Sequence, residues 1–263
     1  MLNFKCLALC FGLFTISQSI FSQIGLYHEI GVVAGPVQFR SDYGLRENEK
    51  TNFGNSGFGV GIVHYINFYF IPQYTTNTYF NDHFKIRNEI SFNRANLKHY
   101  GELVDPSRNS MGANQLRGHS GVASNLDIGT QLEFFPLSLR SFEAFGHLLA
   151  PYASLGVHYT YFSPKVKTTY ANPNQLAIGD VTDSSNFYSG WAPGSVDASP
   201  GGTFSMVSSI GVRYKIGKLS DIVVDLRGQY YFNDWVDGLN HNLDSNQYND
   251  WLIWLNVGYI IYL

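Results

Sequence analysis

Eight segments of the chain alternate between apolar and polar residues with a period of two, and this alternation constrains the fold more than any other feature. In the clearest segment, His83 to Leu97, apolar residues such as Ile86 and Ile90 alternate with charged residues such as Lys85 and Arg87. Because successive side chains of a strand point to opposite faces, each segment predicts a β-strand with one apolar and one polar face. The predicted strands cover residues 27–37, 57–70, 83–97, 122–135, 149–161, 204–216, 220–232 and 249–263.

The predicted strands are too long for an ordinary soluble sheet. Each has about 11 to 15 residues, which is enough to cross a membrane at a tilt, whereas strands of globular proteins usually have about five or six. Aromatic residues make up 16% of the chain and charged residues only 14%. A sheet in lipid must close on itself to satisfy its backbone. We therefore expect an all-β fold, an eight-stranded antiparallel transmembrane β-barrel of the outer-membrane type, surrounded by outer-membrane lipid. The alternative is a soluble β-sandwich or a lipocalin-like barrel.

The links between the predicted strands alternate between long and short. The first, third, fifth and seventh have about 19, 24, 42 and 16 residues, and the others about 12, 12 and 3, as expected for extracellular loops and periplasmic turns. Aromatic residues near strand ends, among them Tyr79, Phe80, Tyr159, Tyr230 and Tyr231, predict the two aromatic girdles of such barrels.

The N-terminus predicts export. Lys5 precedes an apolar run from Cys6 to Ile16, which is about 11 residues long and therefore too short to span a membrane as a helix. We expect residues 1–22 to be a cleaved signal peptide and residues 23–263 to form the barrel domain, located in the cell outer membrane. The only two cysteines, Cys6 and Cys10, lie in this signal, so the mature chain has no disulfide and no cysteine-based zinc site.

The polar face of the predicted strands carries charges of both signs. An eight-stranded barrel has a lumen just wide enough for side chains, so charges inside it must pair and fill it. This predicts a plugged barrel, with a small-solute pore as the alternative. The expected lumen charge network consists of Glu29, Lys85, Arg87, Glu89, Asp127, Glu133, Arg213, Lys215, Asp221, Asp225 and Arg227.

Three polar residues interrupt the apolar faces of neighbouring strands: His64, Asn88 and Thr130. If the strands pair around the link after residue 70, these residues form a lateral row near mid-height of the barrel. Polar groups that face hydrocarbon normally find a partner. The row is therefore a candidate docking seam for another membrane protein, unless its members bond to each other or a bulge displaces one of them.

Catalytic, metal and nucleic-acid sites have little support. The histidines show no metal-binding spacing, and a net charge of −3 gives no basic surface for nucleic acid. His158 and Ser154 share one face of a strand, but residues four apart on a strand are separated by about 13 Å, beyond hydrogen-bond reach. We expect no catalytic residue, metal or cofactor, and keep a lipid-modifying enzyme as an alternative.

The last strand carries a targeting pattern. Its spacing of polar, glycine and two apolar residues is similar to the C-terminal strand signal of outer-membrane barrels. The four positions are Asn256, Gly258, Ile261 and Leu263.

Several short motifs resemble those of small Bacteroidota outer-membrane barrels, a group of uncharacterised flavobacterial proteins related to the PorG-type proteins of type IX secretion. The motifs are HEIG at 28–31, YFNDHFKIR at 79–87, QLEFFP at 131–136 and PYASLGV at 151–157. The resemblance implies a porin-like barrel, and its PorG branch implies contact with periplasmic secretion machinery. The predicted function is a non-enzymatic barrel with a structural or interaction role, accessory to a type IX secretion or outer-membrane assembly complex through other outer-membrane or periplasmic subunits.

Overall fold

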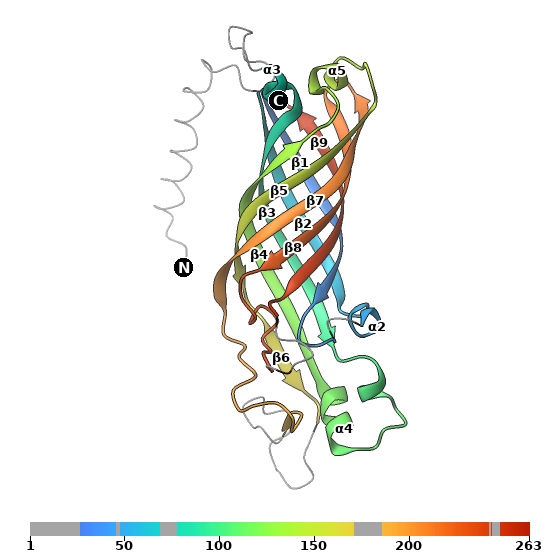
Figure 1. Cartoon of the computed structure of the whole chain (residues 1–263), viewed down its shortest axis with the longest axis vertical. Helices are drawn as coiled ribbons and strands as arrows, with labels where there is room; N and C mark the ends of the chain where they lie inside the picture. Colours follow the sequence, from blue (N-terminus) through green and yellow to red (C-terminus); the bar gives the residue numbers. More distant parts are fainter. Residues whose placement is uncertain (1–26, 46–47, 69–77, 171–185, 242, 244–247) are drawn as a thin grey trace.

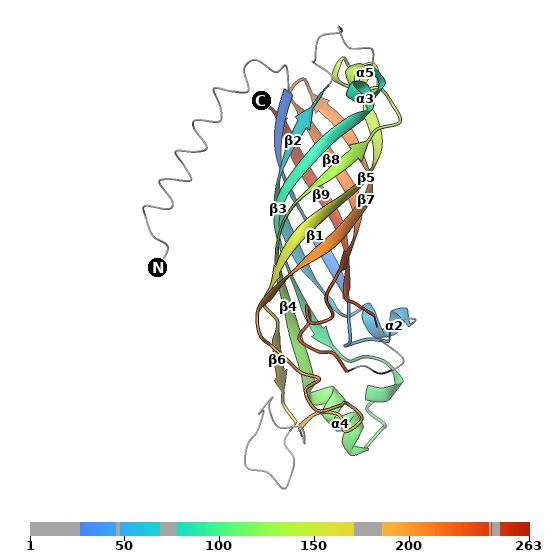
Figure 2. The ribbon, with the colours of Figure 1, turned by 60° about the vertical axis from the view of Figure 1, so that its left-hand side comes forward.

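The computed structural model describes residues 27–45, 48–68, 78–170, 186–241, 243 and 248–263. The predicted signal peptide lies outside these residues. Eight long strands wind around one axis and form an elongated barrel (Figures 1 and 2). They are β1 (Tyr27–Arg40), β2 (Ser56–Asn67), β3 (Phe84–Lys98), β4 (His119–Phe134), β5 (Leu149–Phe162), β7 (Gly201–Gly217), β8 (Ser220–Tyr231) and β9 (Trp251–Tyr262).

The sheet is antiparallel and closed. Each long strand pairs with its neighbours in sequence, β1 pairs with β9, and the short strand β6 (Lys165–Thr168) extends the edge beside β4. The prediction of an eight-stranded antiparallel barrel is confirmed. All backbone hydrogen bonds of a closed sheet are satisfied within it, which is the condition for a sheet in lipid.

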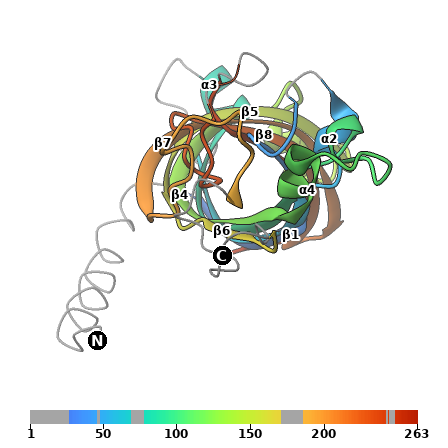
Figure 3. The ribbon, with the colours of Figure 1, turned by 90° about the horizontal axis from the view of Figure 1, so that it is seen from below.

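The links gather at two ends of the barrel. The short-link end carries α3 (Thr78–His83) and α5 (Leu139–Glu143), whereas the long-loop end carries α2 (Glu49–Asn52), the 3₁₀ helix η2 (Glu102–Val104), α4 (Met111–Gly118) and β6 (Figure 1). The view from the long-loop end shows these loops over the ring of strands (Figure 3). None of the helices in the described part of the chain is long and apolar enough to span a membrane.

The barrel is apolar outside and polar inside. Its outward side chains include large hydrophobic residues that are about half exposed, such as Ile62 at 58%, Ile90 at 54% and Ile210 at 66%. Exposing a continuous apolar surface of this size to water would be unfavourable, whereas contact with lipid is not. The architecture is that of an outer-membrane barrel, and it indicates that the chain lies in an outer membrane.

The position of a residue in the alternating pattern of its strand decides whether its side chain faces the lumen or the outside. The last strand and Tyr231 illustrate this. Asn256 and Gly258 face the lumen, whereas Ile261 and Leu263 face outward. The prediction that Tyr231 belongs to an aromatic girdle is wrong. Tyr231 is fully buried inside the barrel because its parity is opposite to that of its neighbour Tyr230.

Candidate functional site

The predicted lumen charge network is buried, and its ion pairs gather in one group around Glu29 and another around Glu89. All eleven predicted members lie inside the barrel, and none is more than 3% exposed. They come from β1, β3, β4, β7 and β8, so the network ties together strands far apart in sequence. Its side chains occupy the space through which a solute would have to pass.

Glu29 connects four strands at the short-link end, β1, β2, β3 and β7. Its carboxylate accepts hydrogen bonds from Lys85 Nζ at 2.7 Å and from Arg213 Nη2 at 2.6 Å. Asn67 donates a third at 2.5 Å. Arg213 also lies 3.0 Å from Asp221, so a chain of alternating charges crosses the lumen.

Glu89 and Arg227 form the strongest pair in the middle of the barrel. The guanidinium of Arg227 donates two hydrogen bonds of 2.6 Å to the two carboxylate oxygens of Glu89. Such bidentate pairs are geometrically specific as well as strong. Arg87 donates a third bond to Glu89 at 3.0 Å and reaches Asp225 at 3.0 Å.

The acids at the margins of the network have different partners. Asp127 accepts hydrogen bonds from the neutral side chains of Asn93 at 3.0 Å and Gln229 at 2.8 Å. Glu133 lies 3.6 Å from Arg87, which is an ion-pair distance without a hydrogen bond. The network is therefore densest around Glu29 and Glu89.

Helix α5 closes the short-link end of the lumen. Its residues Leu139 and Phe142 are fully buried, and the side chain of Ser138 caps its first turn by accepting a bond from the backbone N–H of Ser141. Glu143 at its end accepts a bond from Lys215 Nζ at 2.9 Å. Sequence reasoning missed Glu143 because it belongs to a link rather than to an alternating strand.

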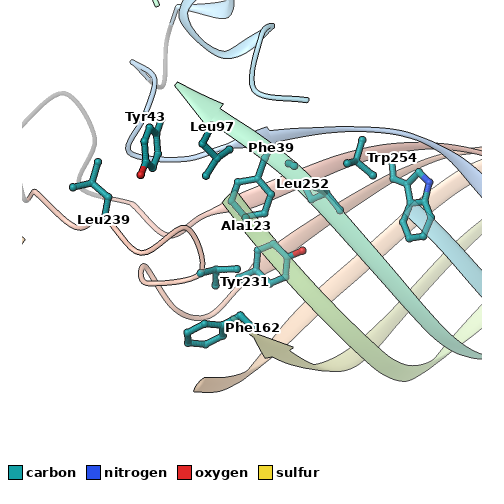
Figure 4. Close-up of a cluster of buried hydrophobic side chains, with 12 residues drawn as sticks. Phe39, Tyr43, Leu97, Ala123, Phe162, Tyr231, Leu239, Leu252 and Trp254 are labelled. Carbon is teal, nitrogen blue, oxygen red and sulfur yellow. The ribbon is translucent and has the colours of Figure 1, made fainter. Parts of the chain in front are cut away.

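An apolar cluster closes the other side of the network. It includes Phe39, Leu97, Tyr231, Leu252 and Trp254, all fully buried, which gather toward the long-loop end (Figure 4). Buried apolar side chains thus flank the charged middle of the lumen at both ends.

The residues weighed for catalysis are lumen packing groups. Ser154 Oγ donates to Gln131 Oε1 at 3.0 Å, and the Gln131 amide lies 3.2 Å from His158 Nε2. Gln131 thus separates the serine from the histidine, so the two do not form a nucleophile and base pair. Across the described ranges, no group of three or more His, Cys, Asp or Glu side chains is arranged to hold a metal ion.

The lateral row exists, with a fourth member. His64 pairs across the strands with Asn88, and Asn88 with Thr130, without a bulge. The Asn88 amide lies 3.4 Å from His64 Nδ1, and His64 Nε2 lies 3.0 Å from Nδ1 of outward-facing His28. Sequence reasoning missed His28, whose parity on β1 could have revealed it.

The row lies in the half of the barrel nearer the short links. His64 is three residues from the end of β2, and both Asn88 and Thr130 are four residues from the strand ends at the short-link side. The row therefore lies between the middle of these strands and their short-link ends, on the outer face, where polar side chains normally find a partner. Its role as a docking seam stays a prediction.

A buried acidic cluster, Asp42, Asp237 and Asp250, lies under the long loops. The backbone N–H of Asp42 donates to Asp237 at 3.1 Å, and that of Asp237 donates to Asp250 at 3.2 Å. Within the described ranges, no Lys or Arg lies within salt-bridge distance of Asp237 or Asp250. Sequence reasoning missed this cluster because residues 195 positions apart meet in it.

The cluster is poor in compensating positive charge. Burial raises the pKa of Asp237 to about 7, and burial together with the neighbouring acids raises the pKa of Asp250 well above its usual value. Nearby, burial lowers the pKa of His99 to about 3 and also lowers the pKa of His241, so neither histidine supplies a cation at neutral pH.

We expect the long-loop end to become less stable as the pH rises from about 4 to about 7. Across this interval folded Asp237, with its pKa of about 7, binds more protons than the unfolded chain, whose carboxyl keeps a value near 3.8. The stabilising contribution of Asp237 is therefore fully present below the pKa of the unfolded chain. It decreases as the pH rises and is lost above the pKa of the folded chain. Hydrogen exchange of residues 233–241 should be faster at pH 8 than at pH 5 after correction for intrinsic rates.

The Asp237→Asn variant tests whether the carboxyl of Asp237 causes this pH dependence. It should reduce this pH dependence, because it removes the titration of Asp237 and one of the acids that raise the pKa of Asp250, whereas Asp105→Asn, an exposed acid of another long loop, should leave it intact. Equal protection of the wild type at both pH values would contradict the assignment.

The chain was compared with known proteins. No protein-family model and no curated protein matches it. Among solved structures, a major outer membrane protein from Thermus thermophilus is 15% identical with a TM-score of 0.47, over 90% of this chain and 99% of that one. Ail, the attachment invasion locus protein of Yersinia pestis, is 9% identical with a TM-score of 0.41, over 90% and 99%. Neisserial surface protein A is 12% identical with a TM-score of 0.39, over 90% and 96%.

These similarities concern the fold alone. The sequence resemblance to Bacteroidota barrels and to PorG-type proteins stays a prediction, since no family comparison matches. The closed sheet, its apolar exterior and its charged interior identify the chain as an eight-stranded β-barrel of the outer-membrane type.

Proposed function

We propose that the protein is a closed, non-enzymatic outer-membrane barrel with a structural or interaction role. One observation carries the proposal: the lumen is occupied by buried ion pairs, with α5 at one end and an apolar cluster at the other. Ions would have to displace paired charges to pass, and each exposed charge would then lose its partner. Because the lumen is filled, an interaction with another molecule would use the two ends of the barrel or its outer wall.

Planar-bilayer recordings test this proposal. The purified full-length protein is expected to give no stable conductance at protein amounts at which an open porin conducts readily in the same bilayers. The physical reason is the pairing of Glu29 and Glu89 with cations across the whole lumen. Steady currents that increase with the amount of protein would overturn the proposal and favour the small-solute pore.

The finer role that we propose is that of an accessory subunit in a type IX secretion or outer-membrane assembly complex. The motifs shared with Bacteroidota barrels support this role, and the lateral row supplies a polar surface on β1 to β4 for a neighbouring subunit. Its position on the outer wall, between the middle and the short-link ends of β2 to β4, suits a partner that lies beside the barrel in the membrane.

A photo-crosslinking residue at position 88 should capture a discrete protein partner in native membranes. The matched control is position 226, where Leu226 faces outward and is 47% exposed among apolar side chains. The row offers polar contacts that the apolar surface around Leu226 lacks, so the control should capture lipid alone. Capture of lipid at both positions would remove the docking seam, without bearing on the closed lumen.

A further inference from the structure

A pocket of about 380 Å³ opens where all four long loops meet. Tyr43 comes from the loop between β1 and β2, Tyr100 from the loop after β3, Trp191 from the loop before β7, and His241 from the loop after β8. Its volume falls in the range of small-molecule sites. A pocket that needs four separate loops to form is a feature of the tertiary structure rather than of any single loop.

The walls of the pocket are aromatic. Tyr43, Tyr100, Tyr188 and Trp191 line it together with leucines. Ring contacts orient these side chains: Trp191 is stacked on His241 with centroids 6.0 Å apart, and Tyr188 meets Trp191 edge-on at 6.2 Å. Four aromatic residues thus line one small space, and aromatic rings attract cations through their π-faces.

The charged side chains that line the pocket in the described part of the chain have one sign. Its charged lining residues are Asp42 and Glu102, and no Lys or Arg is among the described residues that line it. Asp42 also belongs to the buried acidic cluster, because its backbone N–H donates to Asp237. The lining histidines His99 and His241 have lowered pKa values because they are buried, and they add no positive charge. Such surroundings repel anions and favour a cation.

The size and lining of the pocket decide which cation fits. A metal ion needs several oxygen or nitrogen ligands at short range, and the described residues hold no such group. An organic ammonium ion instead uses aromatic faces for its alkyl groups and charge, with carboxylates nearby. We propose that this pocket binds a small organic ammonium ion. The proposal concerns the long-loop end only, and it stands whether or not the lumen conducts.

Calorimetric titration of the full-length protein in detergent tests the charge requirement. Choline is expected to bind saturably, and its uncharged isostere 3,3-dimethyl-1-butanol at least about tenfold more weakly, because the isostere lacks the charge that the rings and acids attract. Equal affinity for the two compounds would overturn the proposal, as would the absence of saturable choline binding up to roughly 10 mM. Glycerophosphocholine distinguishes the sources: affinity equal to that of choline indicates a lipid headgroup, and weaker binding indicates a free amine.

Two exposed residues of the wall provide variants that should not disturb folding. Tyr100 is 38% exposed, and Glu102 is also exposed. Tyr100→Leu and Glu102→Gln should each weaken choline binding by roughly three- to tenfold. Tyr79→Leu, which removes an exposed tyrosine from α3 at the opposite end, should leave the affinity unchanged. Wild-type affinity in both pocket variants would overturn the proposal.

Discussion

Replacing Glu89 by leucine is expected to lower the free energy of unfolding by about 3–5 kcal/mol, the usual cost of leaving a buried charge without its partner. Arg227 donates both of its 2.6 Å hydrogen bonds to Glu89, and both side chains are buried in the middle of the lumen. Leucine cannot accept these bonds, and lipid and the barrel wall keep water from replacing them. Urea unfolding in detergent, followed by the mobility of unheated samples in SDS gels, measures the change.

The double variant Glu89→Leu/Arg227→Leu distinguishes the effect of charge pairing from the effect of side-chain packing. Removing both charges leaves no buried guanidinium at position 227 without a partner, and Arg87 keeps its ion pair with Asp225, so the double variant should be more stable than Glu89→Leu alone. Complete recovery is not expected, because Arg227 also lies 4.9 Å from the ring of Trp254 and Glu89 also binds Arg87. A double variant less stable than the single one would show that packing, rather than charge pairing, dominates at this level.

Replacing Trp254 by alanine is expected to cost about 3–5 kcal/mol, as for other large aromatic residues removed from a packed core. Trp254 is fully buried and belongs to the apolar cluster that closes the lumen. Its ring lies over Gly59 of β2, where an added Cβ would overlap the indole. The glycine therefore makes room for the indole, and the same unfolding assay reports its loss.

Gly59→Ala makes the matched test of this packing. In the wild type the added methyl group must push against Trp254, so the substitution should destabilise the barrel. In Trp254→Ala the same methyl group enters the vacated space, so the substitution should be neutral or stabilising. Equal effects of Gly59→Ala in both backgrounds would show that the two positions do not interact.

The barrel itself could be predicted from period-two alternation, because strand geometry sends alternate residues to opposite faces over the whole length of a strand. The same parity placed Glu29, Glu89 and Arg227 in the lumen, although it could not say which acid meets which base. Strict use of the parity would also have placed Tyr231 inside the barrel and His28 on its outer face.

The height of the lateral row needed the actual strand ends. Pairing of His64 with Asn88 followed from counting around a link, but the distance of the row from the rim depends on where β2, β3 and β4 stop. Links obey no period, so their helices and caps gave no comparable signal. This is why α5, whose Phe142 enters the lumen, was not foreseen.

The sequence by itself determined the closed sheet, its apolar exterior and its charged interior, because these follow from local alternation and from the demand of lipid for satisfied backbone groups. Only the tertiary structure decided the long-loop end. There Asp42 meets Asp237 and His241, about two hundred positions away, through bonds that no local pattern encodes. Contacts between loops depend on how the barrel brings their ends together, and so the acidic cluster and the aromatic pocket beside it exist only in the folded chain.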